Sequence, residues 1–481
     1  MIDRRQFLTS GSAALLGLAS SAHVDARHRD GTTPIVPECR VPLPVPRVLQ
    51  PERSDASTDY YRIVQREALA DILPGVRTRI WGYDGSIPGP TIEARRGRTT
   101  VVTHTNHLGV DTVVHLHGGV TRSESDGFPT DTVSPGNTRS YQYENTGRAA
   151  TLWYHDHSWR DSGRNQYMGL AGFYLLKDDS DVEGRLPSGQ YDVPLMIQDR
   201  TFTDDGQLEY DHERHHGVTG RVALVNGAPW PFMEVAARRY RFRILNASNA
   251  TPLRLALDSH QPLVLIATDQ GLLPRPVVLS TIALAPAERI ELVVDFSSYP
   301  IGSHIVLQNR RAEGGLGVIM RFDVVRAARD DSSVPDQLSD VEPLRRSQAT
   351  RTRTFVFGGK PRLGAPPGVR WEINGESFDP RRVDADPRLG DIEVWRFINR
   401  AFIGQTMLHP VHTHLVPFQV LRRNGGTPLR QERGWKDTVA IEDGEEVDVI
   451  MRWSGYRGRY LLHCHNVEHE DHSMMARVDV V

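Results

Sequence analysis

Three stretches of the chain alternate hydrophobic and polar residues, and each follows a similar glycine-containing turn. The alternating stretches are residues 99–106, 240–246 and 393–399, and each ends in asparagine. The turns contain Gly85, Gly227 and Gly375, which are separated by 142 and 148 residues. Alternation with a period of two predicts strands with one buried face, and recurrence at a fixed spacing indicates a repeated unit. The sequence therefore predicts three β-units of roughly 145 residues each.

The alternation also selects the fold class. Short strands bounded by turn residues, such as 291–296, are typical of antiparallel sandwiches rather than of a parallel sheet with crossover helices. We expect an all-β chain of three consecutive Greek-key β-sandwich domains, at residues 56–185, 186–330 and 351–481. Residues 326–350 are rich in charge and lack periodicity, so they are predicted to link the second and third units.

Two segments precede the first unit. Residues 1–26 contain Arg4 and Arg5 followed by a small, apolar stretch, which resembles a twin-arginine export signal with cleavage after Ala22 or Ala26. That route carries folded proteins, so we expect the twin-arginine export machinery as a partner and a periplasmic or extracellular location. Residues 27–55 are predicted to form an extended arm, because prolines at 34, 37, 42, 44, 46 and 51 forbid a helix.

Composition narrows the possible functions. Lys and Arg number 57 against 60 Asp and Glu, a net charge of -3, so no nucleic-acid partner is expected. The mean hydropathy is -0.42 and no apolar stretch is long enough to predict a membrane span in the mature chain. The only two cysteines, Cys39 and Cys464, cannot build a disulfide framework. The surplus is in histidine, with 20 residues, which indicates metal binding.

Eight of these histidines form four His-x-His pairs, whereas about one pair is expected by chance. The pairs are His115 with His117, His155 with His157, His412 with His414, and His463 with His465. On a strand, residues i and i+2 project from the same face about 6.5 Å apart, so each pair can serve neighbouring metal ions. Two pairs lie in the first unit and two in the third, which predicts a metal cluster between these units with the second as a spacer.

Eight of the histidines outside matched pairs are predicted to be ordinary imidazoles rather than ligands. They are His104, His107, His212, His215, His216, His260, His304 and His472.

A separate metal site is predicted around Cys464. Strand alternation turns its thiolate to the face opposite His463 and His465, so the sulfur must serve a different metal. A cysteine, two histidines and a weakly bound methionine are the ligands of a blue-copper electron-transfer centre. His469 and Met474 follow Cys464 by five and ten residues, and His409 supplies the second imidazole.

The motifs at 153–157, 169–174, 434–438 and 463–472 resemble those of the multicopper oxidases, within them the spore-coat laccases, bilirubin oxidases and phenoxazinone synthases. The resemblance covers essentially the whole mature chain and implies three cupredoxin domains and four copper ions. It implies a type 1 site of His409, Cys464, His469 and Met474, a type 2 site of His115 and His412, and a type 3 pair held by His117, His155, His157, His414, His463 and His465.

The resemblance further implies a laccase-like reaction. Phenolic or aminophenolic aromatics would lose one electron at a time at the type 1 copper, and dioxygen would be reduced to water at the trinuclear centre. Electrons would pass along Cys464 to His463 and His465. Asp126 and Glu470 match acidic residues that the family places near the cluster, which implies proton-relay roles for them.

Some residues depart from the family pattern. Met407 stands where bilirubin oxidases carry a tryptophan, which argues against bilirubin as a substrate, and Cys39 is expected to be a free thiol. The flanking residues 406–408 and 415–418 are mostly apolar, which favours a shelf for flat aromatics over a site for metal ions.

Three alternatives to this interpretation remain. A cuprous or ferrous ion oxidase is one, although the nine methionines form no methionine-rich insert. A non-enzymatic cell-envelope protein of the same fold would have lost ligands, whereas all twelve are present. A zinc hydrolase would not need the set around Cys464.

Overall fold

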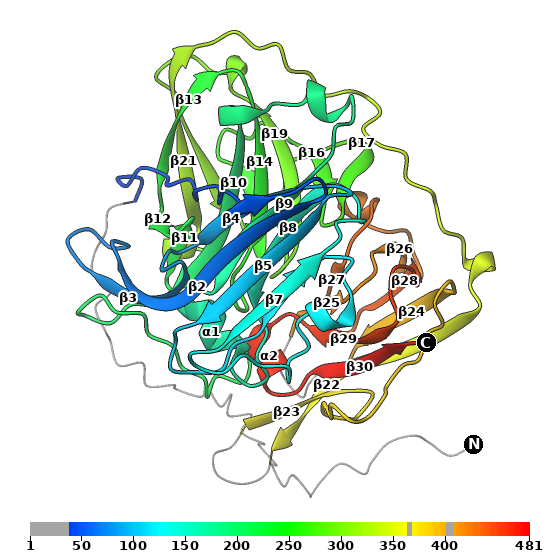
Figure 1. Cartoon of the computed structure of the whole chain (residues 1–481). Helices are drawn as coiled ribbons and strands as arrows, with labels where there is room; N and C mark the ends of the chain where they lie inside the picture. Colours follow the sequence, from blue (N-terminus) through cyan, green and yellow to red (C-terminus); the bar gives the residue numbers. More distant parts are fainter. Residues whose placement is uncertain (1–37, 363–367, 401–406) are drawn as a thin grey trace, which may run out of the picture.

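The chain folds into three β-sandwiches that follow one another along the sequence (Figure 1). The computed structural model describes residues 38–362, 368–400 and 407–481, so the predicted export signal at 1–26 and the first part of the arm lie outside the described residues. The sandwiches take their strands from residues 53–177, 192–327 and 351–480. The predicted all-β class with three cupredoxin-like domains is confirmed.

The first sandwich pairs a five-stranded sheet with a four-stranded one. The larger sheet contains β1 (Arg53–Ser54), β2 (Thr58–Ala70), β3 (Thr78–Tyr83), β5 (Thr99–Asn106) and β7 (Thr138–Tyr143). The smaller sheet has the order β4-β9-β8-β6 and contains β4 (Gly89–Arg95), β6 (Val114–His117), β8 (Ala150–Asp156) and β9 (Ala171–Lys177). The short helix α1 (Ser162–Met168) joins β8 to β9.

The second sandwich pairs a seven-stranded sheet with a five-stranded one. The seven strands are β10 (Asp192–Arg200), β11 (Val222–Val225), β12 (Ala228–Pro229), β14 (Arg239–Asn246), β16 (Leu263–Thr268), β17 (Gly271–Leu279) and β19 (Arg289–Asp295). The five are β13 (Phe232–Ala237), β15 (Leu253–Leu257), β18 (Ile282–Leu284), β20 (His304–Asn309) and β21 (Val318–Ala327).

The third sandwich again pairs five strands with four. The larger sheet contains β22 (Arg351–Arg362), β23 (Gly368–Ile373), β24 (Ile392–Asn399), β26 (Phe418–Arg423) and β28 (Glu446–Arg452). The smaller sheet has the order β27-β25-β29-β30 and contains β25 (His409–Thr413), β27 (Thr438–Ile441), β29 (Gly458–Cys464) and β30 (Met475–Val480). Helix α2 (Val467–Asp471) follows β29. Each sandwich encloses a hydrophobic core of its own.

The repeated turns and asparagines have the same structural role in each sandwich. The turns Asp84–Gly85, Asn226–Gly227 and Asn374–Gly375 have positive φ at both residues, as a two-residue type I′ hairpin requires. The asparagines end β5, β14 and β24, and each donates through Nδ2 to two backbone carbonyls of neighbouring segments. The repeat in the sequence therefore marks one structural corner used three times.

The arm lies against two sandwiches. Leu43 N–H donates to Phe232 O (2.7 Å) in the second sandwich, and Leu49 N–H donates to Thr91 O (2.8 Å) in the first. Between β21 and β22, residues 328–350 carry no strand and only a single 3₁₀ turn.

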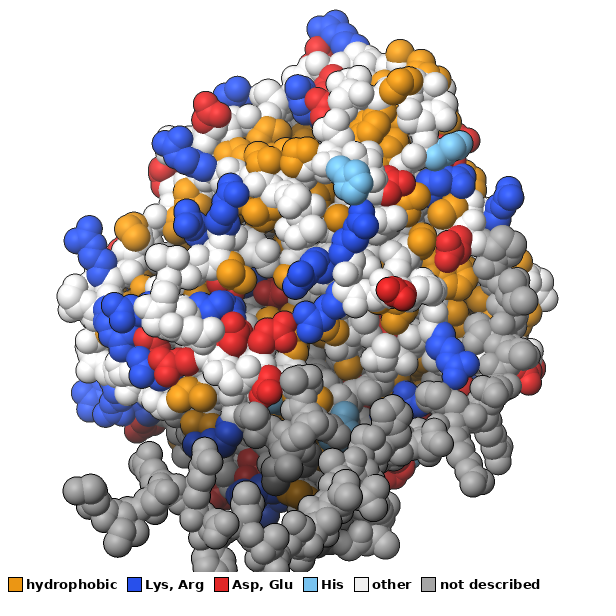
Figure 2. Space-filling view, turned by 180° about the vertical axis from the view of Figure 1, so that it is seen from behind, with side chains coloured by type: hydrophobic (Ala, Val, Ile, Leu, Met, Phe, Trp, Pro, Cys, Tyr) orange, Lys and Arg blue, Asp and Glu red, His pale blue; other side chains and the backbone are white. Residues whose placement is uncertain are grey.

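The surface mixes charges of both signs. On the face in Figure 2, basic and acidic side chains lie interspersed over the described part, in line with the near balance of 57 and 60 charged residues. Within the described ranges, no helix combines the length and the apolar character needed to cross a membrane.

Candidate metal centres

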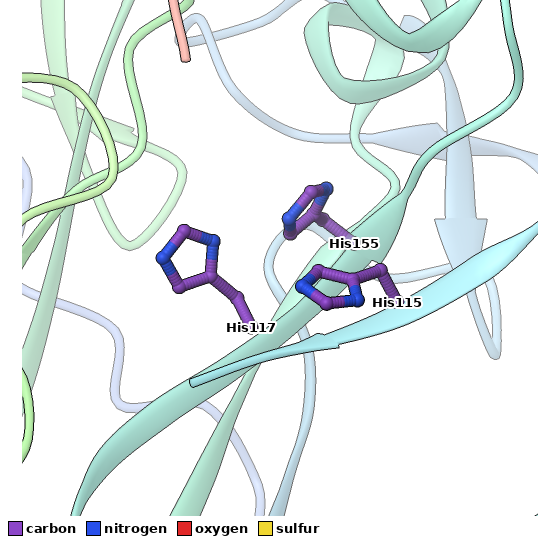
Figure 3. A group of neighbouring side chains, drawn as sticks. All are labelled: His115, His117 and His155. Carbon is purple, nitrogen blue, oxygen red and sulfur yellow. The ribbon is translucent and has the colours of Figure 1, made fainter. Parts of the chain in front are cut away.

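The four-stranded sheet of the first sandwich supplies four of the predicted ligands. β6 carries His115 and His117, and β8 pairs with it in a register that places His155 opposite His115. Figure 3 shows the rings of these three histidines pointing into one space. His157 follows β8, and its backbone N–H donates to Val113 O (3.0 Å). The period of the strand thus directs the pairs to one side, as the spacing predicts.

The four-stranded sheet of the third sandwich supplies the facing ligands. β25 and β29 pair so that His412 lies opposite His463, while His414 and His465 follow the strand ends. Imidazoles of the two sandwiches stack across the interface, His115 on His414 with ring centroids 3.8 Å apart and His117 on His412 at 3.7 Å. The structure therefore brings all eight paired histidines together between the first and third sandwiches.

The ring nitrogens are arranged to bind metal. His463 Nε2 lies 3.3 Å from His157 Nε2 and 3.2 Å from His414 Nε2. Nitrogen ligands about 2.0 Å from one tetrahedral metal lie about 3.3 Å from each other. Buried nitrogens without a hydrogen-bond partner among the described residues include His115 Nε2, His117 Nδ1, His155 Nε2, His412 Nε2 and His465 Nε2. Burial lowers the pKa of His465 to about 3, so its imidazole is neutral, as a metal ligand must be.

Neighbouring oxygens fix which nitrogen of each ring faces the cluster. The Nδ1 atoms of His115, His412 and His155 lie 2.5, 2.8 and 2.9 Å from the backbone oxygens of Asp126, Asp437 and Asp156. A carbonyl accepts the Nδ1 proton and leaves Nε2 for a metal.

Asp126 also contacts the cluster through its side chain. It is fully buried after a 3₁₀ turn, and Oδ2 lies 2.7 Å from His414 Nδ1. Burial raises the pKa of Asp126. The following Gly127 has φ +82°, and a Cβ there would collide with Val114 O, so the Asp-Gly pair lets the chain pass close to β6.

Glu470 lies between two further ligands. Its Oε1 is 3.4 Å from His157 Nδ1 and its Oε2 is 3.2 Å from His463 Nδ1. The side chain is buried in α2, and Glu468 on the same helix accepts instead from Tyr210, Asn249 and Val218. Of these two glutamates, the one that contacts the histidine cluster is therefore Glu470.

Cys464 forms the separate site that the sequence predicts. Its Sγ lies 3.4 Å from His409 Nδ1 and 3.5 Å from His469 Nδ1, and the two nitrogens are 3.1 Å apart. Separations of this size suit donors about 2.0–2.3 Å from one shared metal. Burial raises the pKa of the Cys464 thiol, so a thiolate there requires a cation beside it.

Met474 is tied by its backbone to this site. Its N–H donates to His469 O (2.9 Å), and its carbonyl accepts from Cys464 N–H (3.1 Å). Met474 is buried in the same core as Cys464, whereas Met475 packs in a different cluster with Phe128.

Asp437 is a site residue for which no role was predicted from the sequence. Its Oδ1 lies 3.1 Å from His117 Nε2, and Arg289 grips both carboxylate oxygens. Burial alone would raise the pKa of Asp437, but Arg289 holds it below its usual value. Asp437 carries no spacing signal, and the only sequence indication of a role is its place in the motif at 434–438, directly before a strand that pairs with β25.

A cavity of about 940 Å³ opens near Cys464's site. His215 and His472 line it, with ring centroids 3.7 Å apart and ring planes tilted by 36°. Trp371 donates through Nε1 to His215 O (2.6 Å) and lies against His469, with ring centroids 3.9 Å apart. Trp371 therefore connects His215, in the cavity wall, to His469. Charged residues also line the cavity: Arg160, Asp161, Arg164, Glu213, Arg370 and Asp471.

The predicted apolar shelf is wrong for three of its residues. Leu415, Val416 and Phe418 are at most 3% exposed and belong to the third core. Leu415 and Val416 lie in the connection between β25 and β26, and Phe418 begins β26. All three pack into the third core, so the walls of the cavity come from other segments.

Comparisons with known proteins agree with this geometry. Family models described as multicopper oxidase match residues 66–181, 165–322 and 343–481. A laccase of Bacillus subtilis is 35% identical over 91% of this chain and 97% of its own length. A bilirubin oxidase of Albifimbria verrucaria is 36% identical over 97% of this chain and 88% of its own.

Solved structures are similar over almost the whole chain. A laccase from Pediococcus acidilactici superposes with a TM-score of 0.86 at 31% identity, covering 96% of this chain and 97% of that one. The McoA multicopper oxidase of Aquifex aeolicus gives 0.83 at 32% identity, covering 92% and 100%. With these matches and the two histidine-rich centres, the chain belongs to the multicopper oxidases and is a laccase-like, copper-dependent oxidoreductase that uses dioxygen.

Proposed function

We propose that the enzyme oxidises phenolic or aminophenolic aromatics one electron at a time and reduces dioxygen to water. The observation that carries this proposal is the Cys464 site, which is covalently continuous with the histidine cluster. Cys464 pairs with His409 and His469, while its chain neighbours His463 and His465 turn to the cluster. A donor site and an oxygen site joined by one residue suit an enzyme that separates the two half-reactions.

The donor sets fit four copper ions. Cys464, His409 and His469, with Met474 as a weak ligand, would hold the type 1 ion, and His115 with His412 the type 2 ion. The type 3 pair would be held by His117, His155 and His465, and by His157, His414 and His463. When bound, copper supplies single-electron acceptance at the first site and oxygen reduction at the other three.

Asp126 and Glu470 are proposed to hold the protons that oxygen reduction consumes. Asp126 Oδ2 is within hydrogen-bond distance of His414 Nδ1, and Glu470 lies between His157 and His463. Both carboxyl groups are buried beside ligands on the outer side of the cluster. Each can therefore pass a proton to or from the neighbouring ring without occupying a ligand position.

The cavity beside Trp371 is the proposed site for the aromatic donor. The neighbouring His215 and His472 rings offer aromatic surface close to His469. The principal alternative, a cuprous or ferrous ion donor, is opposed by Arg160, Arg164 and Arg370, because these cations line the same cavity. Asp161 is also paired with Arg164 (2.8 Å), which leaves it less able to attract a metal ion.

Steady-state oxygen uptake tests the substrate class. We expect 2,6-dimethoxyphenol and 2-aminophenol to be oxidised with higher kcat/KM than ferrous or cuprous ions, with bilirubin included in the panel. An efficiency for a metal ion more than about tenfold above that for the phenols, or about 1.4 kcal/mol in transition-state free energy, would establish the metal-ion oxidase instead.

We also propose export by the twin-arginine route to the periplasm or the exterior. The support is Arg4 and Arg5 followed by the small, apolar stretch within residues 1–26. Replacing both arginines by lysine should keep the protein in the cytoplasmic fraction, whereas unchanged export of that variant would reject the proposal.

A further inference from the structure

Arg289 joins all three sandwiches at a single buried guanidinium. It begins β19 of the second sandwich and is fully buried. Nη1 donates to Asp437 Oδ1 (2.7 Å) and Nη2 to Asp437 Oδ2 (2.5 Å), a forked pair with the third sandwich. Nε donates to Thr151 O (3.0 Å) in β8 of the first sandwich. The two remaining N–H groups donate to Ala287 O and Asp269 O, both at 3.0 Å, so all five donors are used.

Asp437, which Arg289 holds in place, contacts one of the predicted copper ligands. Its Oδ1 lies 3.1 Å from His117 Nε2, and Thr438 Oγ1 lies at the same distance from that nitrogen. Gln270 Nε2 donates to the other carboxylate oxygen (2.6 Å). Because an acceptor faces Nε2, the ring carries its proton there and presents the unpartnered Nδ1 to the cluster. His117 is thus oriented oppositely to His115, His155 and His412, whose Nδ1 atoms face the carbonyls.

The two hydrogen bonds from Arg289 explain why Asp437 does not act as a ligand itself. His117, His412 and Asp437 lie close enough to hold an ion. However, both carboxylate oxygens are already engaged by a guanidinium whose charge stays fixed. The carboxylate therefore acts on the histidine ring and not on the metal.

We infer that Arg289 is a positioning residue of the trinuclear centre, which fixes the ring of His117 through Asp437. This inference rests on the proposed four-copper function. It gives the second sandwich, which supplies none of the twelve predicted ligands, control over the affinity of the type 3 ion that His117 holds. Loss of the partner that orients a ligand histidine typically costs about 10–100-fold in metal affinity.

The test compares Arg289→Lys with a matched control. Lysine keeps the charge but cannot form the two parallel hydrogen bonds. After copper loading and titration with a chelator, we expect the variant to release type 3 copper at a chelator concentration about 10–100-fold lower than the wild type does. The antiferromagnetic coupling of the pair should be lost in electron paramagnetic resonance, while the blue band of Cys464 remains. Asp437→Asn should behave in the same way.

Arg243→Lys is the control. Arg243 is also buried in the second sandwich and forms a fork with Asp192, with both hydrogen bonds at 2.8 Å.

 In the described part of the chain, Asp192 bonds to Arg243 and not to the histidine cluster. The control should keep the copper content, the coupling and the chelator resistance of the wild type.

Each outcome decides the inference. Chelator resistance of Arg289→Lys equal to that of the wild type would overturn it, and so would equal losses in Arg243→Lys, which would show general loosening of the second sandwich. If Arg289→Lys does not fold, Asp437→Asn carries the test alone, and full retention of coupled type 3 copper in it overturns the inference. A wild-type protein that binds no copper and shows no blue band would instead reject the proposed function.

Discussion

At the scale of single residues, Cys464 and its two chain neighbours supply ligands to two different metal sites. A strand turns successive side chains to opposite faces, so one tripeptide can serve two metal sites. The Cys464 sulfur is 3.4 Å from His409 Nδ1, while His463 Nε2 is 3.2 Å from His414 Nε2. A change at position 464 should therefore affect one site and spare the other.

Cys464→Ser should abolish the intense blue absorption and nearly all oxidase activity, while the other three coppers stay bound. Thiolate is the strong charge-transfer ligand, and a serine hydroxyl is a poor substitute. Absorption spectra and copper analysis measure this directly. Cys39→Ser is the matched control, because Cys39 is the other cysteine and its backbone N–H bonds to Trp230 O in the arm contact. A blue band that survives in Cys464→Ser would refute the assignment.

Glu470→Gln should slow reoxidation by dioxygen by about 10²-fold or more, yet leave reduction of the blue site by substrate nearly unchanged. The amide keeps the shape of the side chain but cannot deliver a proton. Stopped-flow measurement of each half-reaction separates the two effects. Glu468→Gln is the control on the same helix, since Glu468 bonds to Tyr210 and Asn249. A decrease of less than about threefold in Glu470→Gln would show that the residue is structural.

Residues with a spacing signal could be predicted from the residue pattern alone, whereas the roles of Asp126 and Glu470 depended on the family resemblance. The paired histidines and Cys464 can be recognised in the sequence because the side-chain direction along a strand repeats every two residues. Arg289 belongs to no motif, and Asp437, which lies in the motif at 434–438, is 148 positions away from it in the chain. Only the packing of the second sandwich against the third reveals that they act together.

At the scale of elements, the corner asparagines connect the sequence repeat to stability. Asn246 ends β14 and donates to Thr251 O (2.9 Å) and Leu284 O (3.0 Å), while its Oδ1 accepts from Ser248 N–H (3.1 Å). The residues that carry these groups are buried, so Asn246 satisfies polar groups away from water. The repeated residue is therefore conserved within the chain by the geometry of the corner and not by copper chemistry.

Asn246→Ala should lower the free energy of unfolding by about 2–4 kcal/mol, because buried backbone groups lose their partners. The blue band and copper content of the folded protein should stay unchanged. Denaturant unfolding of the copper-free protein measures the loss. Exposed Asn137→Ala serves as the control and should stay within about 0.5 kcal/mol of the wild type. Equal stability of the two variants would contradict the structural role.

The strands that hold the ligands were predictable, but the walls of the cavity were not. Leu415, Val416 and Phe418 follow the ligands His412 and His414 in the sequence, but they are buried in the core of the third sandwich. The cavity is instead lined by residues from all three parts of the chain, among them Arg160, Glu213 and Arg370. Surfaces assembled from distant loops follow from tertiary packing, which a local pattern does not encode.

At the scale of the whole molecule, the cluster lies in the interface between the first and third sandwiches. Ligands on both sides stack ring on ring, with His115 against His414 and His117 against His412. A metal bound by both sandwiches binds the folded assembly and not the unfolded chain. Copper should therefore contribute to stability as well as to catalysis.

Removal of copper with a chelator should lower the thermal unfolding temperature by several degrees. A ligand present at about 1,000 times its Kd stabilises the native state by about 4 kcal/mol. Calorimetry of loaded and stripped protein measures the difference, and copper added back should restore it. Identical unfolding temperatures would mean that the sandwiches are held together without help from the metal sites.

The arm can dock on the second sandwich only after much of the chain has been synthesised. Cys39 N–H bonds to Trp230 O (2.8 Å), Leu43 N–H bonds to Phe232 O (2.7 Å), and Asn226 Nδ2 bonds to Pro44 O (2.9 Å). A ribosome makes residues 39–44 long before residues 226–232, so these early residues have no docking surface until nearly half of the protein has been translated. The segment made first thus reaches its place only after the second sandwich exists, and its docking marks a nascent chain that has passed that point.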